Sequence, residues 1–170
     1  MDQLRKMTEN FPKTHYWNDS CDLNELKYSL QRGASGATTN PVIVKQVLEK
    51  NLDLYSDFIT SAIAKDPCAS EDDIAWITME KMASDAAALL KPFFDGEKGK
   101  GRISIQTNPK HFNNAEKLIE QTLHFHTIAP NIQVKIPITK AGLAAIKECT
   151  ARGVSINATV SFSVPQALAA

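Results

Sequence analysis

The sequence predicts an α/β protein in which parallel strands alternate with helices. The pattern is clearest in the second half of the chain, where three strand-like segments cover residues 102–108, 132–138 and 154–160. Two helix-like segments, 113–128 and 140–153, lie between them, and the connections are short. This alternation is typical of βα units on a parallel sheet.

The same three segments each have one apolar and one polar face, because successive side chains of a strand point to opposite sides. In the first of them, Ile103 and Ile105 alternate with Ser104 and Gln106. Strands that are covered on both faces are usually apolar throughout, so this sheet needs a different environment on its polar face. The polar face of the other two segments carries Gln133 and Lys135, and then Ser155, Asn157 and Thr159.

Two architectures fit this alternation. In an open sheet, helices cover one face and water covers the other. In a barrel, the apolar face packs against outer helices, and the polar face lines the interior near the end that holds the active site of (β/α) barrels. The barrel directs Gln106, Lys135, Asn157 and Thr159 into one enclosed space, with Asp19 and Asn40 at its rim.

The first half of the chain is predicted to contain two further strands, 14–19 and 35–39, each followed by a helix. Asp22 and Asn40 are residue types that cap helix N-termini, and both stand at the expected position. Residues 51–95 are predicted to be a helical insertion between the second and third strands.

Five strands do not close a barrel, and residues 162–170 start a helix that ends after little more than one turn. We therefore expect a single domain over residues 1–170 that is the N-terminal part, about five βα units, of a (β/α)8 barrel. Unpaired strand edges and an uncovered apolar face favour association, so a homo-oligomer is one expectation.

Composition narrows the functional class. The chain has 19 basic and 19 acidic residues, which argues against binding nucleic acid through bulk charge. No apolar run approaches the roughly 18 residues of a transmembrane helix, and the polar start does not resemble a signal peptide. Three separated cysteines and four histidines show no metal-binding spacing, which is consistent with a cytoplasmic protein that has free thiols and no metal.

Lys135 lies at the centre of a segment that otherwise reads as a buried strand. A poorly hydrated interior favours the neutral amine of a lysine, which attacks a ketone or aldehyde to form a Schiff base. Asp19 is the best-placed carboxylate for proton transfer, while Asn40, Asn157 and Thr159 suit the hydroxyls of a sugar. No cofactor is needed. Each residue also has a purely structural interpretation. Lys135 is then an ion-pair partner, Asp19 a turn residue and Asn40 a helix cap.

Five motifs, in the same order along the chain, resemble one family. The chain is similar to the transaldolase and fructose-6-phosphate aldolase superfamily, and to transaldolases in particular, from about residue 15 onward. "TTNP" alone is a weak signal, but the five together are specific. The motifs are "NDSCDLNELK" (18–27), "GATTNPVIV" (36–44), "ISIQTNP" (103–109), "VKIPITKAGLAAI" (134–146) and "GVSINATVSFSVPQA" (153–167).

The resemblance implies a barrel enzyme with a Schiff-base lysine on its fourth strand, which matches Lys135. It implies transfer of a dihydroxyacetone unit from a ketose phosphate to an aldose phosphate in the pentose phosphate pathway. The implied partners are sugar-phosphate substrates, with no nucleic acid, membrane or cofactor. The other matching residues are Asp19 for proton transfer, Thr38, Asn40 and Asn157 for sugar binding, and Thr159 for positioning the catalytic water.

Two departures from the family pattern keep alternatives open. Transaldolases usually carry a glutamate where this chain has Gln106, and the acidic position that follows is Asn108. Glutamine cannot act as a base, although it can hold a water by hydrogen bonds, as fructose-6-phosphate-type aldolases do. The phosphate-binding residues of the family lie on strands that this chain lacks. An aldolase, or a catalytically silent barrel fragment that is inactive alone, is therefore the alternative.

Overall fold

The computed structural model describes residues 3–96 and 99–170, and it has an α/β fold with five parallel strands. The strands form one sheet in the order β1-β2-β3-β4-β5, which is consistent with about five βα units of the predicted barrel. The chain divides within β3 into two compact units, Met1–Ile103 and Ser104–Ala170, and each is described by itself.

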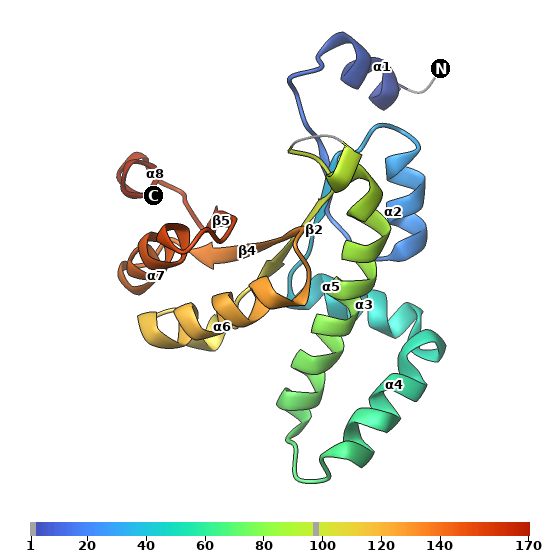
Figure 1. Cartoon of the computed structure of the whole chain (residues 1–170), viewed down its shortest axis with the longest axis vertical. Coiled ribbons are helices and arrows are strands. Elements are labelled where there is room, and N and C mark those ends of the chain that lie inside the picture. Colours follow the sequence, from blue (N-terminus) through green and yellow to red (C-terminus); the bar gives the residue numbers. More distant parts are fainter. Residues whose placement is uncertain (1–2, 97–98) are drawn as a thin grey trace. The chain divides into compact units, whose positions relative to one another are not determined.

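The first unit is mostly helical. In α5, the buried face is formed by small and flexible side chains, including Met82, Ala83 and Ala86, and it packs against α2, α3 and α4. Figure 1 shows α4 and α5 side by side. The elements are α1 (Gln3–Asn10), β1 (Trp17–Asn18), α2 (Leu23–Leu30), β2 (Gly36–Thr38), α3 (Pro41–Lys50), α4 (Leu52–Lys65), α5 (Glu71–Gly96) and the start of β3 (Arg102–Gln106).

The second unit contains the regular βα pattern, and Figure 1 shows its helices α6 and α7 side by side. Both helices pack against β4. The elements that follow β3 are a 3-10 turn (Pro109–His111), α6 (Ala115–Ile128), β4 (Ile132–Pro137), α7 (Lys140–Ala151), β5 (Ile156–Thr159) and α8 (Val164–Ala169).

Burial alternates along β4 as the sequence predicts. Ile132, Val134 and Ile136 are fully buried, whereas Gln133 and Lys135 on the other face are partly exposed. Ile103 and Ile105 on β3 are fully buried in the same way. The predicted apolar face is therefore confirmed for β3 and β4, and β4 packs against α6 and α7.

The predicted burial of the apolar face is wrong for β5. The strand covers only Ile156–Thr159, and Ala158 on its apolar face is exposed. Val160, predicted to continue that face, is 49% exposed and has a φ of 58°. A β-branched residue rarely adopts this left-handed conformation, and it turns the chain out of the strand direction. The strand therefore ends one residue before the predicted boundary.

No helix of the described residues is both long enough and apolar enough to cross a membrane. The tightest approach in the second unit lies instead at the junction of β4 and α7. A Cβ atom on Gly142 would lie 1.8 Å from the backbone oxygen of Pro137. Only glycine allows the first turn of α7 to lie this close to the end of β4.

Gly142→Ala is expected to lower the free energy of unfolding by about 3 kcal/mol, because α7 must move away from β4. Gly96→Ala makes the same chemical change at the end of α5, where an added Cβ meets nothing within 4 Å. It is expected to change stability by less than about 0.5 kcal/mol. Urea unfolding followed by circular dichroism compares the two variants, and equal effects would contradict the packing argument.

Candidate functional site

Lys135 lies in the middle of β4, and its backbone is held from β3. The Thr107 N–H and hydroxyl both donate to the Lys135 carbonyl oxygen, at 3.0 and 3.3 Å. Val134 and Ile136 on either side are fully buried against the helices, so the Lys135 side chain projects from the opposite, polar face. That side chain is half-buried. The structure thus holds a lysine on the one strand face that is not packed against helices.

Asn157 lies beside Lys135 on the neighbouring strand. The register of β4 and β5 pairs Lys135 with Asn157 and Pro137 with Thr159. Residues paired in this way have their side chains on the same face of a sheet. The Asn157 Nδ2 donates to the Ser104 Oγ at 3.1 Å. This polar face therefore brings a lysine, an amide and a hydroxyl together.

Gln106 and Thr159 stand at the carboxyl ends of β3 and β5, and both are half-buried. Within the described part of the chain, neither side chain makes a hydrogen bond. Their polar groups therefore remain available for a ligand or a water, as the predicted role in positioning water requires.

In the first unit, Asp19 and Thr38 come together at the carboxyl ends of two paired strands. The parallel register joins Trp17 to Gly36 and Asn18 to Ala37, so Asp19 and Thr38 are the next residues along β1 and β2. Asp19 is exposed, and Thr38 is half-buried. The carboxyl edge of a parallel sheet is where ligands bind in α/β proteins.

Asn40 serves as the cap of α3, as its alternative interpretation predicted. Its side-chain oxygen accepts from the backbone N–H groups of Val42 and Ile43, at 2.9 and 3.0 Å. Among residues 3–96 and 99–170, no partner accepts a hydrogen bond from its Nδ2. Capping uses only the oxygen end of the amide, so the donor end remains available to a ligand.

The loops that carry these residues are tied together by groups that sequence reasoning missed. Cys21 in the loop after β1 and Thr39 directly after β2 are both buried, and their side chains lie close together. In the second unit, the Thr139 hydroxyl donates to the Phe112 carbonyl at 2.6 Å and accepts from the Gly142 N–H. Long-range pairs of this kind leave no periodic signal in a sequence.

Asp22 anchors the loop after β1. Its Oδ1 accepts from the N–H groups of Asn24 and Glu25, at 2.8 and 3.0 Å, and its Oδ2 accepts from the Asn51 side chain at 2.9 Å. Burial alone would raise the pKa of Asp22, but these hydrogen bonds outweigh it and lower the pKa below its usual value. Asp22 is therefore a structural carboxylate rather than a proton-transfer group.

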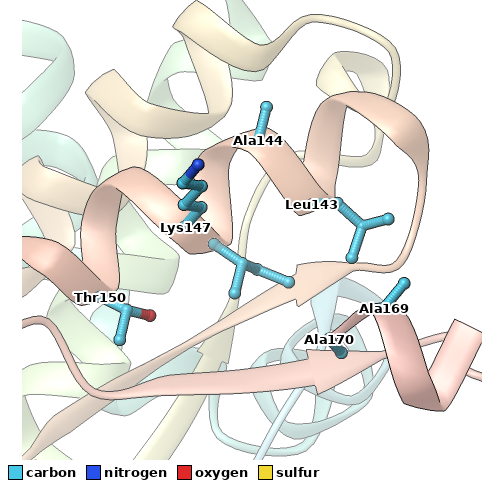
Figure 2. Close-up of a pocket in the computed structure, with 7 residues that line it drawn as sticks. Leu143, Ala144, Lys147, Thr150, Ala169 and Ala170 are labelled. Carbon is cyan, nitrogen blue, oxygen red and sulfur yellow. The ribbon is translucent and has the colours of Figure 1, made fainter.

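Neither a metal site nor the main surface hollow involves the predicted site residues. No group of three or more His, Cys, Asp or Glu side chains in the described ranges could hold a metal ion. A hollow of about 550 Å³ lies between α7 and the end of the chain, and Figure 2 shows Lys147, Thr150 and Ala169 lining it. None of the predicted site residues lines this hollow.

The fold and the site together define a class of protein. This is an α/β protein built from the βα units of a barrel, with a lysine and carboxamides on the polar face of its strands. A family model described as "Transaldolase/Fructose-6-phosphate aldolase" matches residues 16–170. The chain belongs to this family, as its motifs predicted.

Curated relatives agree with this assignment. The chain is 34% identical to Transaldolase 2 of Streptomyces avermitilis over 137 residues, which are 79% of this chain and 36% of that protein. It is 34% identical to a transaldolase of Mycobacterium tuberculosis over 131 residues, 76% of this chain and 35% of that protein. A transaldolase of Mycobacterium marinum gives 34% over 132 residues, with the same two shares. The chain thus spans about a third of the length of these relatives.

Asp22→Ala is expected to lower the free energy of unfolding by about 1–2 kcal/mol at pH 7, because it removes the cap of α2 and the partner of Asn51. The folded pKa of Asp22 lies below the unfolded value, so this stabilisation is complete above that value and is lost as pH falls through the folded pKa. The difference from the native chain should therefore shrink below about pH 3.8. Asp57→Ala, on the exposed face of α4, is the control and should change little at any pH.

Thiol reactivity tests the loop packing. Burial raises the pKa of Cys21 and of Cys149, whereas Cys68 is exposed. Because the thiolate is the nucleophile, one thiol should react quickly with a disulfide reagent at pH 8, and two should react only as the chain unfolds. Cys68→Ser should remove the fast phase alone. A second fast thiol in the folded chain would show that the Cys21 loop is not packed as described.

Proposed function

We propose that this chain carries the Schiff-base chemistry of a transaldolase, with Lys135 as the covalent catalyst. The observation that supports this most is the position of Lys135, half-buried on a polar strand face and in register with Asn157. Membership of the family and the names of its relatives support transfer or aldol chemistry on sugar phosphates. The proposal includes a role in the pentose phosphate pathway in the cytoplasm, without a cofactor.

The first half of the proposed reaction forms a covalent intermediate. The neutral Lys135 amine attacks the C2 carbonyl of a ketose phosphate, and the carbonyl oxygen leaves as water to give an iminium ion. Asp19 takes the proton from the C4 hydroxyl, so that the C3–C4 bond breaks and its electron pair moves into the iminium. An aldose phosphate leaves, and a three-carbon enamine stays on Lys135.

The second half reverses these steps with a new partner. The enamine carbon attacks the aldehyde of an acceptor aldose phosphate, whose oxygen receives the proton from Asp19. Water then hydrolyses the iminium and releases the product ketose. In this proposal Thr38, Asn40 and Asn157 bind sugar hydroxyls, while Gln106 and Thr159 hold the hydrolytic water. We also propose that residues 1–170 form a single domain, which carries all seven residues.

A second candidate is a fructose-6-phosphate-type aldolase, which Gln106 favours. An amide can hold a water but cannot remove a proton from it. If a proton reaches the enamine carbon before an acceptor does, an iminium ion forms again. Water then hydrolyses it, so that the Lys135 amine is regenerated and the three-carbon unit leaves as free dihydroxyacetone. The two candidates therefore differ in whether product formation from a ketose phosphate requires an acceptor aldose phosphate.

The proposed function is tested by trapping the Schiff base. The chain is incubated with fructose 6-phosphate and borohydride, and the modified residue is identified by peptide mass spectrometry. A reduced sugar adduct is expected on Lys135. Lys135→Met should lower adduct formation to the level of a control without sugar, because no amine remains on that strand face. Lys147→Met removes an exposed lysine of α7 in the same unit and should leave the adduct unchanged.

Circular dichroism must show that each variant is folded. No adduct on a folded native chain would favour the catalytically silent alternative, and an unchanged adduct in Lys135→Met would contradict the assignment of the lysine. Release of free dihydroxyacetone without an acceptor would select the aldolase.

A further inference from the structure

We propose that Ser104 is a positioning residue that acts on Lys135 through the side-chain amide of Asn157. This inference deepens the proposed function and rests on it, because it concerns the lysine that forms the Schiff base. It starts from the hydrogen bond of 3.1 Å between the Asn157 Nδ2 and the Ser104 Oγ. These residues are 53 positions apart in sequence, and they lie on strands that are not neighbours.

The hydrogen bond spans β4, which lies between β3 and β5. Neighbouring strands are about 4.8 Å apart, so the backbones of β3 and β5 are about twice that distance apart. Two short side chains can meet at 3.1 Å only if both lean over the intervening strand. The residue of β4 in register with Asn157 is Lys135. The Ser104–Asn157 pair therefore crosses the polar face of β4 beside the base of Lys135.

The burial of Ser104 indicates that its hydrogen bond with Asn157 is part of the stable structure. Ser104 is fully buried, although it belongs to the polar face, whereas Asn157 is partly exposed. A buried hydroxyl that lacks a partner is unfavourable, and the Asn157 amide provides one. Ser104 in turn restricts the torsion of the Asn157 side chain, because one end of the amide is fixed on a buried and immobile group.

Fixing one end of the amide determines the direction of the other. A carboxamide has a donor end and an acceptor end, and here the donor end is used on Ser104. Among the described residues, none donates to the Asn157 Oδ1. This acceptor lies on the face from which Lys135 projects. An acceptor there orients one N–H bond of the neutral amine, and thereby the lone pair that attacks the C2 carbonyl.

The chain offers a matched control on the same face. The Gln133 Nε2 donates to the Ser155 Oγ at 3.1 Å and to the Ile156 carbonyl at 3.2 Å. This second amide–serine pair joins neighbouring strands and does not involve Asn157. Ser155→Ala therefore removes a serine hydroxyl from a similar hydrogen bond without releasing the Asn157 amide.

The test measures the rate of borohydride-trapped adduct formation on Lys135 in the full chain, with fructose 6-phosphate in excess. Ser104→Ala is expected to slow it about five- to tenfold, which corresponds to the loss of one hydrogen bond. Asn157→Ala should slow it at least as much. The double variant should be no slower than Asn157→Ala alone, because Ser104 acts only through Asn157. Ser155→Ala should stay within about twofold of the native rate.

If the double variant is slower than Asn157→Ala by the same factor as Ser104→Ala slows the native chain, the inference is wrong. Ser104 would then affect the rate independently of Asn157, for example through folding. An unchanged rate in Ser104→Ala, with the native chain forming its adduct, would also overturn it while leaving the proposed function intact. A folded native chain that forms no adduct would contradict the proposed function itself, and with it the role assigned toward Lys135.

A second measurement needs no activity. The side-chain amide signals of Asn157, assigned by comparison with Asn157→Ala in ¹⁵N-labelled chain, report its hydrogen bond directly. Ser104→Ala should move these signals, and Ser155→Ala should leave them in place. If Ser104→Ala leaves them in place on a folded chain, Ser104 does not hold the amide and the inference is wrong.

Discussion

The alternation of buried and half-buried residues along β4 is the constraint on which the rest of the structure depends. Side chains on a strand alternate between faces, so a slip of one residue would turn Ile132, Val134 and Ile136 away from the helices. The same slip would direct Lys135 against them, where an unpaired charge is strongly unfavourable. The packing of the core and the orientation of the lysine are therefore set by one register.

Two carboxamide side chains, Asn40 and Asn157, each make a structural hydrogen bond with one end and keep the other end available. Asn40 caps α3 with its oxygen and keeps its nitrogen available, and Asn157 satisfies Ser104 with its nitrogen and keeps its oxygen available. Carboxamides suit this double use because their two ends have opposite hydrogen-bonding character. The interpretation of Asn40 as a helix cap and its interpretation as a sugar ligand are thus compatible.

Local patterns predicted much of this fold, and non-local contacts account for what they missed. The period of two predicted the buried face of β3 and β4, and the residue types at Asp22 and Asn40 predicted two caps. The link between Ser104 and Asn157 joins distant segments, so no spacing rule could have revealed it. The end of β5 depends on the backbone of Val160, whose left-handed conformation a valine gives no reason to expect.

In the proposed function, the glutamine at position 106 affects the handling of water rather than the carbon–carbon bond. In the proposed reaction, Asp19 removes the C4 hydroxyl proton and later returns it to the acceptor oxygen, so bond cleavage and formation need one carboxylate. Hydrolysis of the iminium needs a water that is held and activated. Gln106 can hold it by hydrogen bonds but cannot take its proton, so that proton must pass to another group. Among the seven proposed residues, Asp19 is the only carboxylate. In the proposed reaction it has already returned its proton to the acceptor oxygen when hydrolysis begins, so it is the group that can take the proton of the water.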